Sequence, residues 1–412
     1  MMNRIIENQK LSGEISAITS KSYAHRAILA SLLSNGNSTI IIDNLSKDIE
    51  ASLRSITSLG ASINRSGNKF HIIPPKKFKS PVTLNVGESG TTLRLIIPII
   101  ATLGLDAKIV REGSLIGRTN SIYFDLLPKH GVEIYEDGDA IYLSGKLVDF
   151  NFKIPGNVSS QFISGLMLAS GASDKDFKIG ITTELESRPY IDITTHVLQK
   201  FGLEIIEDGK TFLCKNTFVA TEYVVERDWS NALFFLAAGV KVKGLNKNSK
   251  QGDKKALEFL KKLGFQNISK DEYQLKKINS AEDMRILDAR DIPDTVPILC
   301  VISALAYGCT EIINIKRLRL KESDRVKSTV EMLENLGVKV DLCEDSFSFD
   351  GIDTFKSTKI NSHNDHRIAM ASAIAATFAD GPVEIIDSEC VEKSYTDFYK
   401  DFESLGGAIN VL

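Results

Sequence analysis

Two interleaved series of glycines repeat along the whole chain, and this repetition limits the possible folds more than any other feature of the sequence. The first series follows amphipathic segments at steps of 71, 71, 62, 73 and 69 residues and comprises Gly60, Gly131, Gly202, Gly264, Gly337 and Gly406. The second follows more apolar segments at steps of 68, 67, 68, 69 and 73 residues and comprises Gly36, Gly104, Gly171, Gly239, Gly308 and Gly381. Glycines of the first series suit a left-handed helix cap, and a strand-like alternation follows all of them except at FQN. We therefore predict an α/β fold built from six repeats.

Each repeat contains two kinds of helix. The segments of the second series are apolar nearly all round, which predicts buried helices, whereas those of the first series have one polar face. Six such repeats in 412 residues exceed a single core, so we predict two domains of three repeats, with a boundary near VERDWSNALFF. A solenoid is the alternative. It is disfavoured because the segments that lead into the buried helices are polar and dissimilar, which suggests that they converge on one place.

The entrances to the buried helices carry the polar chemistry. They read SKSYAHR, GESGTTLR, GNVSSQF, ERDWSN, RDIPDTVP and NDHR. Helix N-termini offer free N–H groups and partial positive charge, which favour anions. Cationic side chains lie at or near these entrances and other helix starts: Lys21, Arg26, Arg94, Arg118, Lys321, Arg325, Arg367 and Lys393. The pattern predicts an anion-binding cleft.

Composition excludes several classes of protein. The net charge of -3 gives no bulk attraction to nucleic acid or to an anionic membrane. The first ten residues contain no apolar core of signal-peptide length, and no apolar stretch is as long as a membrane span, so we expect a cytoplasmic protein. The five cysteines include no CxxC spacing, which indicates neither a disulfide framework nor a metal site.

Eight motifs distributed along the chain resemble those of the 5-enolpyruvylshikimate-3-phosphate synthase family. They are SKSYAHRA, GESGTTLR, GNVSSQF, SRPYID, IPD, LKESDR, NDHRIAM and KSYTDF, in the family's order. The resemblance implies an inside-out α/β barrel of two domains, each of three repeats, with helix N-termini facing the cleft. It places the first domain at residues 20–227 and the second at residues 1–19 and 228–412.

The resemblance also implies an activity. The enolpyruvyl group of phosphoenolpyruvate is joined to the 5-hydroxyl of shikimate 3-phosphate and phosphate is released, a shikimate pathway step toward chorismate and the aromatic amino acids. We expect a monomer that needs neither a metal nor an organic cofactor. Because Gly90 has no methyl group, the resemblance further implies inhibition by glyphosate in competition with phosphoenolpyruvate.

The family motifs assign roles to individual residues of this chain. Asp294 is expected to accept the hydroxyl proton, Glu322 to exchange a proton at the vinyl methylene, and Lys21 to assist catalysis. The residues expected to bind shikimate 3-phosphate are Lys21, Ser22, Arg26, Ser159, Ser160, Gln161, Ser187, Tyr190, Asp294 and Lys321. Those expected to bind phosphoenolpyruvate are Lys21, Gly90, Arg118, Gln161, Arg325, Arg367 and Lys393.

Simpler interpretations exist for some of these residues. Asp294 and Glu322 suit helix starts, where acidic side chains often act only as caps or complement the macrodipole. Arg94 suits a purely structural role equally well, and packing or hydrogen bonding suits His366 better than proton transfer does.

The chain departs from the family pattern at four positions. Thr119 and Thr396 replace common prolines, Arg317 replaces a polar or acidic residue, and Glu88 replaces a frequent asparagine. We expect Glu88 to bring a carboxylate near the phosphoenolpyruvate site.

Two other functions remain as alternatives. A sister enzyme that transfers enolpyruvyl to a nucleotide-linked amino sugar has the same repeats, but it commonly uses a cysteine in the loop that here reads EGSLIGRTNS. A noncatalytic anion-binding or RNA-processing repeat protein would have lost the acids or gained a basic surface. The only tryptophan, Trp229, lies beside the second domain crossing, where we expect its solvent exposure to report domain closure.

Overall fold

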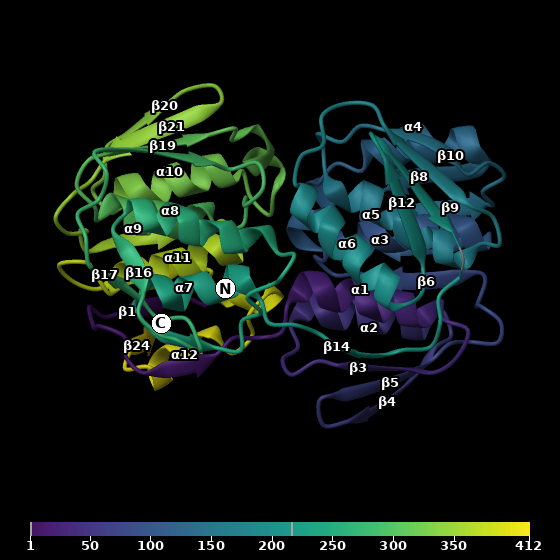
Figure 1. The fold of residues 1–412 in the computed structure, drawn as a ribbon, viewed down its shortest axis with the longest axis horizontal. Helices are drawn as coiled ribbons and strands as arrows, with labels where there is room; N and C mark the ends of the chain where they lie inside the picture. The colour runs from purple at the N-terminus through teal and green to yellow at the C-terminus, as the bar shows by residue number, and fades with distance from the viewer. Residues whose placement is uncertain (1, 216) are drawn as a thin grey trace. The chain divides into compact units, whose positions relative to one another are not determined.

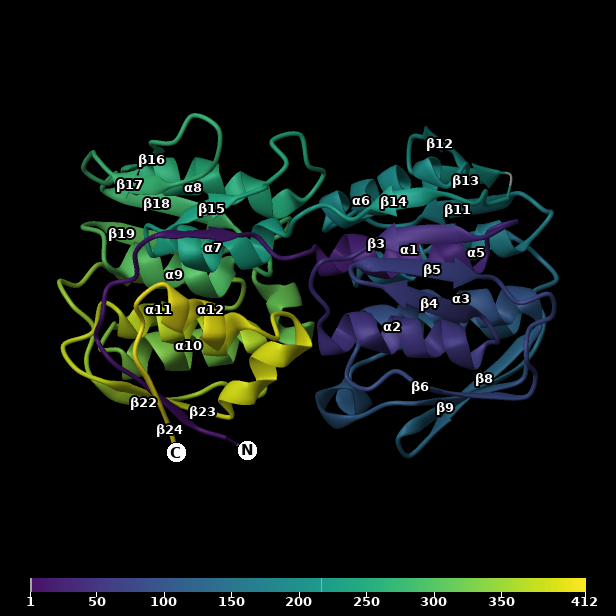
Figure 2. The same ribbon diagram turned by 90° about the horizontal axis from the view of Figure 1, so that it is seen from below.

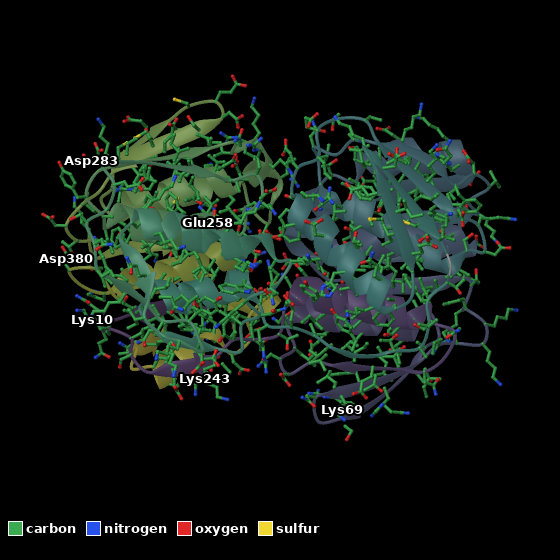
Figure 3. The ribbon with its side chains drawn as sticks, in the orientation of Figure 1. Lys10, Lys69, Lys243, Glu258, Asp283 and Asp380 are labelled. Carbon is green, nitrogen blue, oxygen red and sulfur yellow. The ribbon has the colours of Figure 1, made fainter. Side chains whose placement is uncertain are left out.

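The computed structural model describes residues 2–215 and 217–412, which form two compact units (Figures 1 and 2). Unit 1 comprises Met1–Ile18 and Arg227–Leu412, and unit 2 comprises Thr19–Glu226. Each unit has its own core of buried apolar side chains. Charged side chains such as Lys69 and Asp380 are exposed, and they point away from the ribbon (Figure 3).

The helices of unit 2 form an inner and an outer set. The inner helices contact one another and are α1 (Lys21–Leu32), α3 (Gly90–Leu103) and α5 (Ser160–Ala169). The outer helices are α2 (Lys47–Ser58), α4 (Ser121–Leu126) and α6 (Arg188–Lys200). Short 3-10 helices are η1 (Gly113–Gly117), η2 (Leu127–His130) and η3 (Ser170–Ala172). The inner helices are buried nearly all round because their sequences lack a polar face.

Three four-stranded sheets surround the helices of unit 2, and all three have the same order of parallel and antiparallel pairs. In each, one parallel pair of strands is followed by an antiparallel hairpin. In the second and third sheets the two parallel strands flank an inner helix, whereas in the first sheet the strand that follows α1 pairs with a strand from the end of the unit. The first sheet is β14 (Glu222–Val224), β3 (Ser38–Ile41), β5 (Lys69–Ile73) and β4 (Ser62–Ser66). The second is β6 (Val82–Asn85), β7 (Ala107–Val110), β9 (Ala140–Gly145) and β8 (Val132–Asp137). The third is β10 (Asn151–Ile154), β11 (Phe177–Ile181), β13 (Thr211–Lys215) and β12 (Glu204–Asp208).

Unit 1 repeats this arrangement of helices. Its inner helices pack together and are α7 (Trp229–Ala237), α9 (Val296–Ala304) and α11 (His366–Ala376) (Figure 1). The outer helices are α8 (Ala256–Lys262), α10 (Arg325–Asn335) and α12 (Phe398–Ser404). The 3-10 helices are η4 (Gly252–Lys255), η5 (Lys316–Leu320) and η6 (Ser388–Lys393).

Two sheets of unit 1 have the same order of parallel and antiparallel pairs as those of unit 2, and the remaining strands form pairs. One sheet is β18 (Met284–Asp288), β19 (Cys309–Ile313), β21 (Ser346–Asp350) and β20 (Val340–Leu342). The other is β22 (Thr358–Asn361), β23 (Val383–Ile386), β1 (Arg4–Ile6) and β24 (Ile409–Val411). The pairs are β2 (Glu14–Ser16) with β15 (Lys241–Lys243), and β16 (Phe265–Asn267) with β17 (Leu275–Lys277). FQN therefore forms a strand, although its sequence lacks the apolar alternation that follows the other five glycines.

Strands from distant parts of the chain complete the repeats. At the N-terminus, β1 pairs with β23 and β24, and β2 pairs with β15, so this segment completes two repeats of unit 1. In unit 2, β14 pairs with β3 and supplies the outermost strand of the first sheet. The chain passes between the units at Ile18–Thr19 and at Glu226–Arg227.

The regularly spaced glycines of the two series have two different structural causes. All six glycines of the first series have positive φ, between 86° at Gly264 and 109° at Gly60, which confirms the predicted left-handed caps. Gly36, Gly171 and Gly381 of the second series do not have positive φ, and at Gly171 close packing explains the glycine instead. A Cβ atom on Gly171 would lie 2.2 Å from the ring of Phe218, so no side chain fits. The predicted α/β fold of six repeats is confirmed.

No helix among the described residues is long and apolar enough to cross a membrane.

The side chain of Trp229 is buried. It is 0% exposed, and its indole N–H donates to the carbonyl oxygen of Asn246 at 3.0 Å. The expectation that a change in its exposure reports domain closure is therefore wrong, since this side chain is already buried in the core of unit 1.

Candidate active site

In unit 2, Arg26 connects the first inner helix to the outer helix α6. Its side chain is buried, its Nη1 donates to the carbonyl oxygen of Ser22 at 2.7 Å, and its Nε donates to Oγ1 of Thr194 at 2.7 Å. Nη2 donates to the carbonyl oxygen of Tyr190 at 3.3 Å. Burial lowers the pKa of Arg26 to about 10, which still leaves the guanidinium charged at neutral pH. Three predicted shikimate 3-phosphate residues are thereby brought together.

Two further predicted residues lie at the starts of helices in the same unit. Lys21 is the first residue of α1, and its Nζ lies 2.9 Å from Oδ2 of Asp48 in a largely buried ion pair. Ser187 precedes α6, has a left-handed φ of 54°, and is 1% exposed. A non-glycine residue in this conformation is strained and persists only where surrounding contacts fix it. Neither Asp48 nor the strain at Ser187 was predicted from the sequence.

The entrances of α3 and α5 are joined through Gln161. Its Nε2 donates to Oγ1 of Thr91 at 2.9 Å, and its Oε1 accepts from Nη1 of Arg94 at 2.8 Å. Ser159 caps α5, with its Oγ accepting from the backbone N–H of Gln161 at 3.3 Å, and Ser160 is buried as the first helical residue. Arg94 therefore has a structural role here, because it fixes the side-chain amide of Gln161.

Arg118 occupies the space beside Gly90. A Cβ atom built on Gly90 would lie 2.9 Å from Nη1 of Arg118, so a methyl group requires the guanidinium to move. The loop that carries Arg118 is held by Glu88, whose Oε2 accepts from the backbone N–H of Ser114 at 3.1 Å and from its Oγ at 3.0 Å. The carboxylate of Glu88, two residues before Gly90, thus anchors the loop that carries Arg118.

In unit 1, Arg325 is the centre of a buried cluster of charges. Its Nε and Nη2 donate to the two oxygens of Asp365 at 2.9 and 3.2 Å, and Nη2 also donates to Oε2 of Glu322 at 2.6 Å. Nη1 donates to Oδ1 of Asp294 at 2.7 Å and to the carbonyl oxygen of Pro293 at 3.3 Å. A guanidinium has five N–H donors, so these five contacts use all of them.

The two predicted catalytic carboxylates lie on the accessible side of this cluster. The side chains of Asp294 and Glu322 are 23% and 22% exposed, whereas those of Arg325 and Asp365 are 0% exposed. Nζ of Lys321 lies 3.2 Å from Oδ1 of Asp294. Burial lowers the pKa of Lys321, and the negative charge of Asp294 partly opposes that shift.

Helix capping does not account for either acid. The residue that precedes α9 is Thr295, so Asp294 lies outside the capping position. At α10 the capping side chain belongs to Asp324, whose Oδ1 accepts from the backbone N–H of Lys327 at 3.2 Å. Asp294 and Glu322 instead share Arg325 as a partner.

The remaining predicted cations of unit 1 lie around the start of α11. Nη2 of Arg367 donates to Oγ of Ser230 at 2.7 Å, and Nζ of Lys393 donates to the carbonyl oxygen of Asn364 at 2.9 Å. Asp365 caps α11 by accepting from the backbone N–H of Arg367 at 2.9 Å while it also binds Arg325. One buried carboxylate thus joins two of the predicted phosphoenolpyruvate residues.

Sequence reasoning missed the acidic partners of these cations. Asp365 stands in NDHR, where an aspartate at a helix start beside an arginine could have indicated an acidic partner for the cations. The sequence around Asp48 carries no comparable signal. Ion pairs between Lys21 and Asp48, or between Arg325 and Asp365, join residues 27 and 40 positions apart, so only the fold brings them together.

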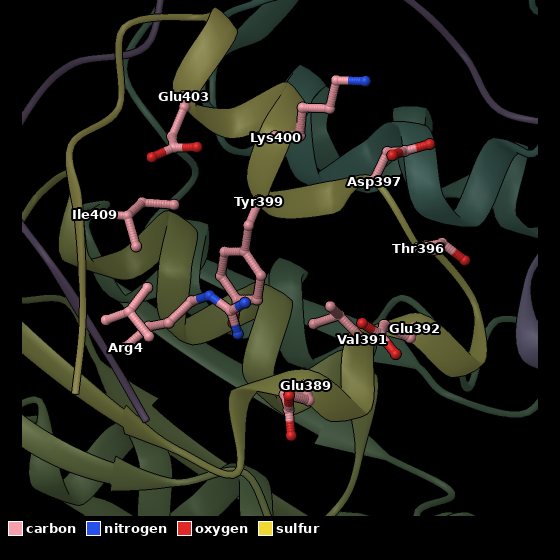
Figure 4. A pocket seen from close by; sticks show the side chains of 11 residues that line it. Arg4, Glu389, Val391, Glu392, Thr396, Asp397, Tyr399, Lys400, Glu403 and Ile409 are labelled. Atoms are coloured by element: carbon pink, nitrogen blue, oxygen red, sulfur yellow. The ribbon is translucent and has the colours of Figure 1, made fainter. Parts of the chain in front are cut away.

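A cavity elsewhere in unit 1 contains none of the predicted site residues. It measures about 260 Å³ and is lined by residues of β1, η6, α12 and β24, with the guanidinium of Arg4 4.3 Å from the ring centroid of Tyr399 (Figure 4). Carboxylates and cations both line it, so its charge favours no one class of ligand.

Among the described residues, no group of three or more His, Cys, Asp or Glu side chains could hold a metal ion, and all five cysteines are free thiols.

Comparisons with known proteins agree on one family. A family model described as EPSP synthase (3-phosphoshikimate 1-carboxyvinyltransferase) matches residues 5–402. The 3-phosphoshikimate 1-carboxyvinyltransferase of Clostridium novyi is 39% identical over 100% of this chain and 99% of its own length, and that of Clostridioides difficile is 37% identical over 97% of each chain.

Solved structures share the fold at lower identity. EPSP synthase from Acinetobacter baumannii has a TM-score of 0.79 at 23% identity and covers 100% of both chains. The enolpyruvyl transferase NikO from Streptomyces tendae has a TM-score of 0.78 at 16% identity and covers 100% of this chain and 98% of its own. Because the sequence motifs, the six repeats and the extent of the sequence matches all agree, the chain belongs to the EPSP synthase (3-phosphoshikimate 1-carboxyvinyltransferase) family.

Proposed function

We propose that this protein transfers the enolpyruvyl group of phosphoenolpyruvate to the 5-hydroxyl of shikimate 3-phosphate and releases phosphate. Family membership supports the reaction, and the observation that carries it for this chain is the charge cluster of unit 1. There, Asp294 and Glu322 are both partly exposed and both bound to one buried guanidinium. Two accessible carboxylates beside cations suit a reaction that needs proton transfers at two positions, a hydroxyl oxygen and a vinyl carbon, next to anionic groups.

The two units are proposed to contribute different parts of the substrate contacts. Each substrate carries one phosphate and one carboxylate, so many cations and N–H donors are required. Unit 2 mainly binds shikimate 3-phosphate, through Lys21, Ser22, Arg26, Ser159, Ser160, Gln161, Ser187 and Tyr190. Asp294 and Lys321 of unit 1 also contact this substrate. Phosphoenolpyruvate is bound by Lys21, Gly90, Arg118, Gln161, Arg325, Arg367 and Lys393.

Asp294 and Glu322 divide the proton transfers. As the 5-hydroxyl oxygen bonds to C2 of phosphoenolpyruvate, Asp294 accepts the hydroxyl proton and Glu322 delivers a proton to the methylene, with Lys21 stabilising developing negative charge. A methyl group results. Glu322 then takes a proton back from that methyl, the C–O bond to phosphate breaks, and inorganic phosphate leaves. Glu322 is thereby protonated again, as at the start, and Asp294 returns to its ionised form by passing the hydroxyl proton to the departing phosphate or to water.

Arg325 is proposed to hold the two acids as well as to bind substrate. Because all five of its N–H donors have protein acceptors, direct contact with phosphoenolpyruvate requires it to release Glu322 or Asp294. An arriving phosphate or carboxylate would replace one anionic partner by another, which leaves the guanidinium paired throughout.

The protein is further proposed to act as a cytoplasmic monomer, without a cofactor and without nucleic acid or membrane partners. Its net charge of -3 supports the absence of nucleic acid and anionic membrane binding.

The test of the proposed function is phosphate release. The protein is mixed with shikimate 3-phosphate and phosphoenolpyruvate together, and with each alone, and inorganic phosphate is measured. Release that requires both substrates supports the transfer. Release from phosphoenolpyruvate alone indicates a phosphatase, and no release with both substrates contradicts the proposal.

A further inference from the structure

A buried carboxyl group that the proposed chemistry does not use lies in unit 1. Asp253 belongs to η4 and is 5% exposed, and its Oδ1 has no hydrogen-bond partner among residues 2–215 and 217–412. An ionised carboxylate is costly to bury without a partner, so such a group tends to keep its proton. Burial first, and then the negative charge of Asp294, raise the pKa of Asp253 to about 7.

Its position is fixed against the entrance of α7. Gln251 precedes η4, and its Oε1 accepts from the backbone N–H of Trp229 at 2.9 Å. Nε2 of Gln251 donates to the carbonyl oxygen of Arg227 at 2.7 Å. These bonds tie the segment that carries Asp253 to the first residue of α7.

Arg367 reaches the same helix entrance from α11. Its Nη2 donates to Oγ of Ser230 at 2.7 Å, and that hydroxyl donates to Oδ1 of Asp228 at 2.9 Å. Nε of Arg367 is buried and has no hydrogen-bond partner within the described residues. The charges that act on Asp253 are the guanidinium of Arg367 and the carboxylates of Asp294 and Asp228.

We propose that Asp253 is a positioning residue that acts through Arg367, and that it holds a proton when phosphoenolpyruvate binds. This inference rests on the proposed role of Arg367 in binding that substrate. An ionised Asp253 would offset part of the guanidinium charge and repel the incoming anion, whereas a neutral Asp253 leaves that charge available. By linkage, the bound anion favours the protonated form, so binding takes up a proton.

The pH dependence of substrate affinity tests the proposal. KM for phosphoenolpyruvate is measured at saturating shikimate 3-phosphate from pH 6 to pH 8.5, for the wild type and for Asp253→Asn, which keeps the shape of the side chain and is always neutral. We expect the two to agree near pH 6, and the wild-type KM to rise about fivefold or more relative to the variant by pH 8.5. Asp341→Asn, at an exposed carboxyl of the same unit, is the control and should follow the wild type.

Other outcomes separate this proposal from the proposed function. A rise in KM shared equally by the wild type and Asp253→Asn comes from ionisation of the substrate phosphate and overturns the role of Asp253, while phosphate release with both substrates still supports the transfer. Calorimetry of phosphoenolpyruvate binding in two buffers with different ionisation enthalpies gives a readout that does not depend on turnover. Greater proton uptake by the wild type than by Asp253→Asn supports the proposal, and equal uptake contradicts it.

Discussion

Asp365→Asn removes the carboxylate that Arg325 holds with two N–H groups, and it tests whether the buried cluster needs that charge. Asp365 and Arg325 are both 0% exposed, and Asp365 also accepts from Oγ of Ser323 at 3.1 Å and from the backbone N–H of Arg367 at 2.9 Å. Asparagine keeps the capping oxygen, since it caps helices well. Its NH2 group, however, would face the N–H groups of a guanidinium, so the main loss is electrostatic.

The expected cost follows from the burial of the pair. Removing one partner of a buried ion pair costs about 3–5 kcal/mol, because the other charge stays buried without compensation. Here Asp294 and Glu322 remain bound to Arg325, so we expect about 3 kcal/mol, at the lower end of that range. For a unit of this size, a loss of about 3 kcal/mol lowers the melting temperature by roughly 6–12 °C.

Urea unfolding followed by the fluorescence of Trp229 measures this loss in the correct unit, since the only tryptophan is buried in the core of unit 1. The transition midpoint should fall while its slope is unchanged. Glu344→Gln is the control, because it breaks a pair with Lys316 in which both side chains are largely exposed, and it should leave the midpoint where it is. A loss below about 1 kcal/mol for Asp365→Asn would refute the reasoning, since it would mean that the other two acids compensate Arg325 fully.

Four further predictions address the site. Asp294→Asn and Glu322→Gln should each lower kcat by orders of magnitude and leave shikimate 3-phosphate binding within a modest factor, and near-normal turnover would remove that residue from the chemistry. Arg367→Lys should raise KM for phosphoenolpyruvate more than KM for shikimate 3-phosphate, because lysine lacks the fork, and equal effects would mean that the anion sites are wrongly assigned. Gly90→Ala should weaken both glyphosate inhibition and phosphoenolpyruvate binding, because its Cβ would lie 2.9 Å from Nη1 of Arg118, which must then shift. An unchanged inhibition constant and an unchanged KM for phosphoenolpyruvate would show that the space beside Gly90 is not part of the site. The unfolding free energy of Asp253→Asn should increase relative to that of the wild type as pH rises from about 4 to about 7, because the folded wild-type carboxyl has a pKa near 7 whereas the unfolded one ionises near 3.8. A constant difference between the two proteins across that window, measured by the same urea assay, would contradict the raised pKa.

The sequence by itself determined the repeats, the buried helices and the helix ends. These features depend on local chemistry: an apolar helix has no face to expose, and a left-handed cap favours glycine because the residue has no Cβ. Glycine therefore marked all six caps of the first series correctly. Close packing against distant side chains is not a local property, which is why Gly171 has the same spacing as its series but a different cause.

The tertiary structure alone decided how the charges are paired. The cations Lys21 and Arg325 were identified as candidates from their motifs, but their partners Asp48 and Asp365 are chosen by the packing of helices that are distant in sequence. A carboxylate's role depends on its burial and its neighbours, and neither is encoded by the residues beside it. For the same reason Asp253 lies in a lysine-rich sequence typical of a solvated surface, yet the fold buries its side chain in a segment that is hydrogen-bonded to the entrance of α7.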